Sequence, residues 1–340
     1  MTVDGRPRVL AAIINYNRAD LTLATVDSLL GLSGEAPMVA LVIDSASGPA
    51  DLERLRAELP EQVSLVELPV NGGYGAACNV AIGQALAEGV PFVWLLNNDI
   101  AFEPGCLREL VRALDDSPDL AASAPVVVEY DRPEIVLSSG MKIRMRFGKA
   151  SHRRFGLSVT SLPSQLERVD AVEASALLIR TSATATCGGF DEGFFMYWED
   201  LEWSLRARNH GWALASVSTA RVRHRLSQSS TPLGRIEYMI RNRIRMVRLH
   251  GSAWDQATFM TYMVFGWLPA YALARLLFRY GPTWTARTVL RPLQWNIRDA
   301  ARRGQWRLTS ADQLIGPRSG GRLGGSSVSV GGGRPDRDQG

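Results

Sequence analysis

An aspartate follows the end of an apolar run in the first third of the chain. Residues 92–96 are Phe-Val-Trp-Leu-Leu, and two asparagines and Asp99 come directly after them. Such a run is typical of a buried strand, and open α/β sheets present ligand groups at the carboxyl ends of their strands. Mg²⁺ and Mn²⁺ prefer oxygen ligands, which nucleotide sites supply from one or two carboxylates and from phosphate. Asp99 is therefore a candidate metal ligand, and the alternative is a polar turn.

A second acidic motif, Glu199-Asp200, follows the bulky apolar residues 194–198 at the start of an expected helix. A carboxylate in apolar surroundings can act as a general base, because burial raises its proton affinity. The alternative is that both acids simply complement the dipole at the helix N-terminus. In the same helix, Glu202 and Arg206 have the i,i+4 spacing of a surface ion pair.

His224 is one of only four histidines and ends a basic, strand-like segment. It is either a solvated side chain or a neutral imidazole ligand to a metal, a role that histidine fills more often than any other residue.

The glycine-rich loop Asn71–Gly75 allows two interpretations as well. Its glycines could let backbone amides approach an anion at a helix N-terminus, or they could form a tight turn. The spacing matches neither the dinucleotide fingerprint nor the P-loop.

Alternating strands and helices must position these residues. We expect strands over residues 8–14, 38–44, 63–68 and 91–96, and helices over 21–30, 52–59, 75–87 and 104–114. This alternation predicts a parallel sheet with helices on both faces. Further strands are expected over residues 124–130, 169–180 and 217–225, whereas residues 131–168 read as irregular and rich in loops.

The composition places few other limits on function. The 340 residues are 46% hydrophobic and 21% charged, which suits one large globular domain with an appendage. Cys78, Cys106 and Cys187 are odd in number and far apart, which argues against a disulfide framework or a zinc site and favours a reducing compartment. The first residues run straight into a strand-like segment, so we expect no secretory signal.

Residues 234–307 differ in charge from the rest of the chain. They contain 13 arginines, no lysine and three acids, a net charge of +10, which leaves −6 elsewhere, and they hold five of the nine tryptophans. This mixture is typical of a nucleic-acid surface or a membrane interface. The apolar residues 257–278 favour the membrane, but Pro269 and Arg275 interrupt them. Because a span needs about 20 apolar residues with few charges, we expect an interfacial or re-entrant hairpin.

The segment before that hairpin, residues 235–250, has the pattern of an amphipathic helix. Its apolar residues share one face, and Arg241, Arg245 and Arg248 are expected largely away from it. From Gly316 onward the chain is rich in Gly, Ser, Arg and Asp, so this tail should be disordered.

The motifs together resemble the family 2 inverting glycosyltransferases of the GT-A fold, and among them the bacterial rhamnosyltransferase-like members. The resemblance covers roughly residues 8–250, and its motifs occur in the family's order. They are Ile14–Asn17, Ile43–Ser47, Asn71–Asn79, Leu96–Asp99, Phe195–Asp200 and Arg223-His224. The resemblance implies a mixed sheet flanked by helices, with a helical, membrane-associated C-terminal appendage.

The resemblance also implies roles for individual residues. Asp200 matches the catalytic base and Glu199 stands beside it, while Asp99 ends the DXD-type motif that holds a divalent metal, and His224 can complete the metal shell. The nucleotide-sugar site would be formed by Asn15, Asn17, Asp44, Asn71, Gly72, Gly73, Tyr74, Gly75, Asn79, Asn97 and Asn98. Two departures stand out: the DXD motif retains one carboxylate, and the loop after Asp44 lacks the family's usual Asp-Gly.

These inferences define one expected function. The chain should be a metal-dependent (Mg²⁺ or Mn²⁺) inverting glycosyltransferase that moves rhamnose from dTDP-rhamnose to a lipid-linked or cell-envelope glycan. It would act at the cytoplasmic face of the bacterial plasma membrane as a peripheral or monotopic protein. No nucleic-acid partner is expected, and a homodimer is one possible assembly. The alternatives are another donor, such as GDP-mannose or a UDP-hexose, and a catalytically silent protein that binds nucleotide sugars or glycans. The expected domains are residues 1–230 (catalytic), 231–315 (membrane-associated) and 316–340 (tail).

Overall fold

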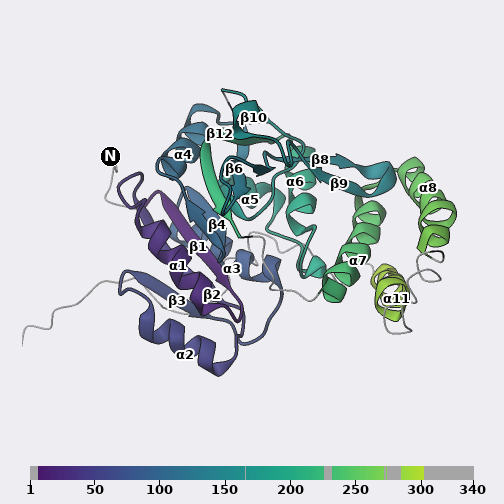
Figure 1. The fold of residues 1–340 in the computed structure, drawn as a ribbon, viewed down its shortest axis with the longest axis horizontal. Coiled ribbons are helices and arrows are strands. Elements are labelled where there is room, and N and C mark those ends of the chain that lie inside the picture. Colours follow the sequence, from purple (N-terminus) through teal and green to yellow (C-terminus); the bar gives the residue numbers. More distant parts are fainter. Residues whose placement is uncertain (1–6, 165, 226–231, 272, 274–284, 302–340) are drawn as a thin grey trace, which may run out of the picture.

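A computed structural model describes residues 7–301 apart from residues 165, 226–231, 272 and 274–284 (Figure 1). The predicted tail, residues 316–340, and the end of the apolar stretch 257–278 lie outside the described residues. The described chain forms a large α/β part, followed by helices that lie beside it at the end of the molecule opposite α1 and α2.

The first part of the chain alternates strands and helices, as the sequence predicted. Its elements are β1 (Val9–Asn15), α1 (Ala19–Leu30), β2 (Met38–Asp44), α2 (Pro49–Glu58), β3 (Val63–Glu67), α3 (Tyr74–Glu88), β4 (Phe92–Asn97), β5 (Ile100–Phe102) and α4 (Cys106–Asp116). Helix α2 begins three residues earlier than predicted, because Pro49 suits the first helical turn, where its missing N–H costs nothing. The short strand β5 was not predicted.

The second part departs more from the expectation. Its elements are β6 (Leu120–Glu129), β7 (Val136–Ser138), β8 (Met141–Arg144), η1 (Met145–Phe147), β9 (Lys149–His152), η2 (Val159–Ser161), β10 (Glu167–Arg168), β11 (Ala176–Arg180), α5 (Thr181–Cys187), η3 (Glu192–Phe194), α6 (Glu199–Asn209) and β12 (Ala213–His224). The region 131–168 was predicted to be irregular, but it contains an antiparallel hairpin of β8 and β9. Conversely, residues 169–175 were predicted as part of a strand and are a loop that leads into β11.

The sheet is mixed. Its strand order is β10-β12-β6-β11-β4-β1-β2-β3, with β5 paired to β12 and β7 to β6. The pairs β1–β2, β1–β4 and β2–β3 are all parallel, as predicted. Strand β11 is antiparallel to both β4 and β6, so the sheet is not wholly parallel, and it matches the mixed sheet that the resemblance implied.

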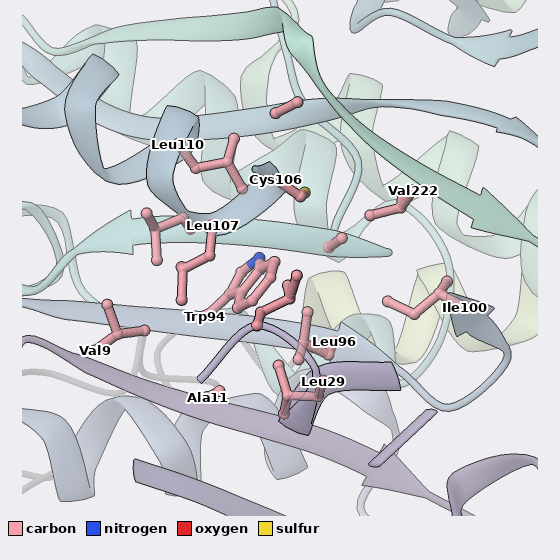
Figure 2. Close-up of a cluster of buried hydrophobic side chains, with 14 of the residues drawn as sticks. Val9, Ala11, Leu29, Trp94, Leu96, Ile100, Cys106, Leu107, Leu110 and Val222 are labelled. Carbon is pink, nitrogen blue, oxygen red and sulfur yellow. The ribbon is translucent and has the colours of Figure 1, made fainter. Parts of the chain in front are cut away.

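Strand β4 lies inside the sheet and is buried on both faces. Trp94 and Leu96 belong to one apolar cluster with Leu29 and Leu110 (Figure 2), while Val93 and Leu95 belong to the cluster on the opposite face. Residues of a strand alternate between the two faces, so a strand covered on both sides is apolar at every position. This explains the continuous apolar run before Asp99.

The last described elements are helical: α7 (Pro232–His250), α8 (Ala253–Tyr262), η4 (Met263–Trp267), η5 (Ala286–Leu290) and α11 (Arg291–Ala301). None of the helices in the described part of the chain is both long and apolar enough to cross a bilayer. The prediction for the arginines of α7 was wrong in part. Arg241 and Arg245 are buried, because Arg241 donates to the Gly193 carbonyl and Arg245 pairs with Asp191 (2.7 Å).

Candidate active site

The pairing of β5 with β12 brings Asp99 and His224 together. Strand β4 ends at Asn97, a short turn follows, and β5 then runs antiparallel to β12 with Ile100 opposite His224. The N–H of Arg225 donates to the Asp99 carbonyl (3.0 Å), and His224 Nε2 lies 3.0 Å from Asp99 Oδ1. The two side chains that were predicted as metal ligands are therefore in contact with each other.

The surroundings of this pair favour positive charge. Asp99 is 4% exposed, and its partner His224 is largely buried. Burial alone lowers the pKa of a histidine, but the hydrogen bond to Asp99 and the charges of Asp99 and Glu173 outweigh it and raise the pKa of His224 above its ordinary value. Within the described residues, no group of three or more His, Cys, Asp or Glu side chains could hold a metal ion. Asp99 and His224 would therefore supply only part of a metal shell.

Asn15, the last residue of β1, lies at the centre of a buried polar network. Its Nδ2 donates to Asp44 Oδ1 (2.7 Å) and Asp51 Oδ2 (3.0 Å), and its Oδ1 accepts from Thr22 Oγ1 (2.7 Å) and Asn98 Nδ2 (3.3 Å). Because β1 lies between β2 and β4 and is parallel to both, the network ties together the carboxyl ends of three strands. This is the edge of the sheet at which the donor was predicted to bind.

Asp44 and Asn17 hold the loop that follows β2. Asp44 is 1% exposed and accepts from the N–H of Ser47 (2.9 Å). The N–H of Asn17 donates to Ser47 Oγ (2.8 Å), and Asn17 Oδ1 accepts from the N–H of Gly48 (2.8 Å). These contacts order the loop at the predicted nucleotide site, and direct contact of either side chain with a donor stays a prediction.

The glycine-rich loop packs against another backbone segment. Gly73 has a φ of +89°, and a Cβ there would lie 2.0 Å from the Phe195 carbonyl oxygen, so the position requires glycine. The N–H of Tyr74 donates to the same carbonyl (2.7 Å), and Asn71 Oδ1 accepts from the N–H of Gly73 (2.9 Å). The lack of a side chain at Gly73 therefore lets the 190–195 segment pack against the loop. This favours the tight-turn interpretation for this one glycine. Gly72 beside it is partly exposed.

Gly75 and Asn79 fasten α3 to the same segment. A Cβ at Gly75 would lie 3.2 Å from Phe190 Cβ. Asn79 is 4% exposed; its Nδ2 donates to the Phe190 carbonyl (3.0 Å) and to Glu192 Oε1 (2.9 Å), and its Oδ1 accepts from the N–H of Phe190 (2.7 Å). Both residues thus help to place the chain that leads to Glu199.

That approach to Glu199 is conformationally unusual. Phe195, Tyr197 and Trp198 have φ values of 63°, 68° and 76°, in a region that costs a non-glycine residue on the order of 1–3 kcal/mol. Asn242 of α7 offsets this cost, because its Nδ2 donates to three carbonyls of the segment. The acceptors are Phe194 (2.9 Å), Met196 (2.7 Å) and Tyr197 (2.7 Å). Asn242 was not predicted as a site residue, and its signal in the sequence is a lone amide among arginines.

Glu199 and Asp200, the first residues of α6, have different surroundings. Burial, together with the Asp200 charge, raises the pKa of Glu199 to about 8. Burial also raises the pKa of Asp200, to about 6, although the backbone N–H groups of Ala174 (3.1 Å) and Leu201 (2.8 Å) donate to its carboxylate and oppose the shift. Asp200 is partly exposed and Glu199 is buried. Asp200 is therefore the carboxylate with access to a ligand.

The loop of residues 173–175 joins the two parts of the site. The Ser175 carbonyl accepts from the N–H of Asn97 (2.8 Å), next to the Asn-Asn-Asp motif, while the N–H of Ala174 donates to Asp200. Glu173 accepts from Ser175 Oγ (2.8 Å) and lies 3.0 Å from the Nδ1 of His152. The sequence gave no signal for Glu173 or His152, whose contact depends on the unpredicted hairpin.

Glu202 and Arg206 form an ion pair, but the prediction that it lies on the surface was wrong. Their side chains are 2% and 7% exposed and their closest atoms are 2.7 Å apart. Arg206 also donates to the Gly189 carbonyl (2.6 Å), and His250 Nε2 lies 3.0 Å from Glu202 Oε1. The pair is buried because α5 and α7 cover this side of α6, which the spacing of two residues could not reveal.

The family model of glycosyl transferase family 2 matches residues 11–173. The chain is similar to N-acetylglucosaminyl-diphospho-decaprenol L-rhamnosyltransferase of Mycobacterium tuberculosis, with 29% identity over 59% of this chain and 71% of that protein. It is also similar to dTDP-rhamnosyl transferase RfbF of Shigella flexneri, with 22% identity over 70% of this chain and 75% of that one.

Two solved structures share the fold. GalNAc-T7 with UDP, GalNAc and Mn²⁺ aligns with a TM-score of 0.61 and 14% identity over 90% of this chain, and the match spans only 59% of that chain. The mannosyltransferase PcManGT from Pyrobaculum calidifontis, in complex with GDP-Man and Mn²⁺, aligns with a TM-score of 0.50 and 16% identity over 88% of both chains. The two structures show a shared fold, while the family match and the rhamnosyltransferase relatives support a family 2 glycosyltransferase that is rhamnosyltransferase-like.

Proposed function

We propose that the protein is an inverting glycosyltransferase that moves rhamnose from dTDP-rhamnose to a lipid-linked or cell-envelope glycan. The observation that carries the proposal is that one loop connects the Asn97-Asn98-Asp99 motif with the carboxylate of Asp200. Residues 173–175 bond to Asn97 on one side and to Asp200 on the other. An inverting transfer needs two such groups, because the leaving diphosphate and the attacking hydroxyl lie on opposite sides of the sugar.

Asp200 is proposed as the general base. Its carboxylate is partly exposed, and its pKa of about 6 leaves it ionised at neutral pH. An ionised carboxylate can accept the proton of the acceptor hydroxyl as that oxygen attacks the anomeric carbon. Glu199, buried beneath it with a pKa of about 8, is neutral at the same pH, so we assign it to positioning.

Asp99 and His224 are proposed as the protein ligands of a divalent cation. A carboxylate and an imidazole suit Mn²⁺, and for Mg²⁺ the carboxylate is the better donor. The two side chains fit the role because they already meet at 3.0 Å in surroundings that favour positive charge. Such a cation would stabilise the negative charge of the departing nucleoside diphosphate. Diphosphate oxygens and water would complete the shell.

The donor and acceptor are proposed from the names of the relatives. One of these proteins is named as a dTDP-rhamnosyl transferase, and the other as a rhamnosyltransferase acting on N-acetylglucosaminyl-diphospho-decaprenol. A polyprenyl-linked acceptor lies in a membrane, so an enzyme that uses it must reach the membrane surface. We accordingly place the protein at the cytoplasmic face, where it binds peripherally.

Apolar side chains on the C-terminal helices support this location. A cavity of about 160 Å³ between α7, α8, η4, η5 and α11 is lined almost wholly by apolar side chains, among them Ile244, Met263 and Leu293. On η4 and α11, two of the elements that line it, Phe265 and Ile297 are 78% and 69% exposed. Exposed apolar patches can mark interaction or membrane sites.

A thermal-shift panel with dTDP-rhamnose, GDP-mannose and UDP-glucose, each with and without Mn²⁺, tests the proposal. A donor at about 100 times its Kd adds about 2.7 kcal/mol of stability, which corresponds to a rise in Tm of several degrees. We expect this rise for dTDP-rhamnose and only with Mn²⁺. A rise for another sugar nucleotide would assign a different donor, and no rise with any of them would contradict a transferase that uses nucleotide sugars.

A further inference from the structure

The loop of residues 173–175 has a second property that the proposed roles do not use. In it, Ser175 bonds to the end of β4 and the adjacent Ala174 bonds to Asp200, so the backbone that follows Glu173 is held by both parts of the site. Glu173 is the loop's charged residue. Glu173 adjoins Ala174 and Ser175, which contact the two parts of the site, and its negative charge acts on both His224 and Asp200.

On the proposed function, this position has a chemical meaning. The diphosphate would lie at Asp99 and His224, and the acceptor hydroxyl would lie at Asp200. The sugar that is transferred must occupy the space between these two groups, because its anomeric carbon is bonded first to the diphosphate and then to the acceptor oxygen. A side chain on the loop that joins the two is therefore positioned to reach the sugar ring.

A second residue reaches the same place from the β8–β9 hairpin. His152, the last residue of β9, has Nδ1 3.0 Å from Glu173 Oε2. The hairpin is anchored nearby, since the N–H of Met141 donates to the Ala171 carbonyl (2.8 Å). The side chain of Glu173 is 17% exposed and that of His152 is 43% exposed. One side of the pair is thus held by contacts with the protein, and the other side is open to solvent.

We propose that Glu173 and His152 form the subsite that recognises the hydroxyl groups of the transferred sugar. The inference rests on the proposed function and names the residues that select its donor sugar. The Glu173 carboxylate accepts hydrogen bonds from sugar hydroxyls. His152 offers the edge that carries Nε2, the ring nitrogen that does not face Glu173. Neither residue contacts the nucleotide, whose predicted site lies at the ends of β1, β2 and β4.

A purely structural role is the competing explanation, in which the pair only holds the hairpin on the loop. The two roles differ in one measurable respect. A sugar subsite distinguishes a nucleotide sugar from the nucleoside diphosphate that lacks the sugar, whereas a structural brace affects the binding of both to the same degree.

The experiment measures the Kd of dTDP and of dTDP-rhamnose by calorimetry in the presence of Mn²⁺, or of the corresponding pair for the donor that the panel selects. The variants are Glu173→Gln, which keeps the shape and the contact with Ser175, and His152→Ala. Ser151→Ala is the control, because Ser151 is the preceding residue on β9 and its side chain faces the opposite way.

We expect both variants to bind dTDP within about twofold of the wild type and to bind dTDP-rhamnose roughly 10- to 100-fold more weakly, as for the loss of a hydrogen bond to a charged group. Ser151→Ala should change neither Kd. Equal weakening of both compounds, or no change in either, would overturn the inference while leaving the proposed function intact. A wild-type protein that binds neither compound would overturn both.

Discussion

Adjacent carboxyl groups can have different chemical roles, and the surroundings of Glu199 and Asp200 separate theirs. Glu199 is 5% exposed, and its Oε2 accepts no hydrogen bond within the described part of the chain. A buried carboxyl with an oxygen that lacks a hydrogen bond is more stable when protonated, in agreement with its pKa of about 8. Asp200, which accepts two backbone N–H groups, is the member of the pair that is ionised at neutral pH.

At the residue scale, the first prediction concerns this base. We expect Asp200→Asn to lower turnover by roughly 10²–10⁴-fold, the usual cost of removing a general base, with donor affinity nearly unchanged. Glu199→Gln should lower turnover less. In the wild type, turnover should rise with pH through about 6, as the Asp200 carboxyl ionises. Turnover measured at saturating donor and acceptor checks this, and a dead Glu199→Gln beside an active Asp200→Asn would reverse the two roles.

The second prediction concerns stability and pH. The pKa of Glu199 is raised from 4.5 to about 8 in the folded protein, so the folded state binds more protons than the unfolded state between these pH values. Its contribution to stability is therefore complete below pH 4.5 and is lost as the pH rises toward 8, by at most about 1.4 kcal/mol per pH unit. Glu199→Gln removes this loss. Denaturant unfolding at pH 5 and pH 8 should show the variant gaining on the wild type at pH 8, and a difference independent of pH would contradict the assignment.

A third prediction concerns the metal. Asp99→Ala should abolish the Mn²⁺-dependent part of donor binding without unfolding the chain, because Asp99 is the one acid of the Asn97-Asn98-Asp99 motif. Calorimetry with dTDP-rhamnose, with and without Mn²⁺, measures this effect. Asp131→Ala, which removes an exposed acid, serves as the control. Full metal-stimulated turnover by the Asp99 variant would exclude Asp99 as the main ligand.

At the element scale, α7 acts as a brace for the segment that leads to the base. Asn242 binds three of its carbonyls, and Arg245 lies between Asp191 (2.7 Å) and Asp299 (2.5 Å) with 3% of its side chain exposed. The boundary predicted at residue 230 therefore divides, in sequence, two segments that pack together in the structure. The brace explains how consecutive residues with positive φ are maintained before Glu199.

The fourth prediction follows from this arrangement. Arg245→Met should destabilise the protein by about 3–5 kcal/mol, because it leaves the Asp191 carboxylate buried without its cationic partner. It also leaves Asp299 with Arg248 alone among the described residues. Arg298→Met on α11 removes an exposed arginine and should change stability by less than about 0.5 kcal/mol. Urea unfolding of the two variants provides the comparison. Similar stabilities would show that the buried contacts of α7 do not support the fold.

The same helix shows what a sequence can and cannot predict. Its end at His250 and its amphipathic pattern follow from local periodicity, as do β1 to β4 and the helices between them, whereas its start at Pro232 is three residues earlier than predicted. The direction of its arginines does not, because their partners, such as Asp191, are about 50 residues away. Likewise β5 and the direction of β11 depend on strands that are distant in sequence. The residues themselves indicated Asp99 and His224 one at a time, and only the resemblance placed them in one metal shell, whereas the contact of His152 with Glu173 depends on long-range pairing that neither predicted.

At the scale of the whole molecule, the positive charge and the apolar surface lie in the same part of the chain. Arg291 and Arg298 of α11 are exposed, and so are Phe265 and Ile297. Basic residues near an anionic bilayer contribute about 1 kcal/mol each, and apolar side chains add to this as they leave water. A membrane-bound orientation would then follow from α8, η4 and α11 together, while α7 stays inside the fold.

The fifth prediction tests that orientation. The double variant Phe265→Asp, Ile297→Asp should sediment with phosphatidylglycerol vesicles at least tenfold more weakly than the wild type, because two apolar side chains that are 78% and 69% exposed become charged. Val70→Asp is the matched control: Val70 is 68% exposed but lies in the loop after β3, outside the C-terminal helices. Removing everything after residue 230 would also remove the α7 brace, so point substitutions separate binding from folding where truncation does not. Equal sedimentation of all three proteins would mean that neither Phe265 nor Ile297 touches lipid. The membrane contact would then lie elsewhere on the protein or would not exist.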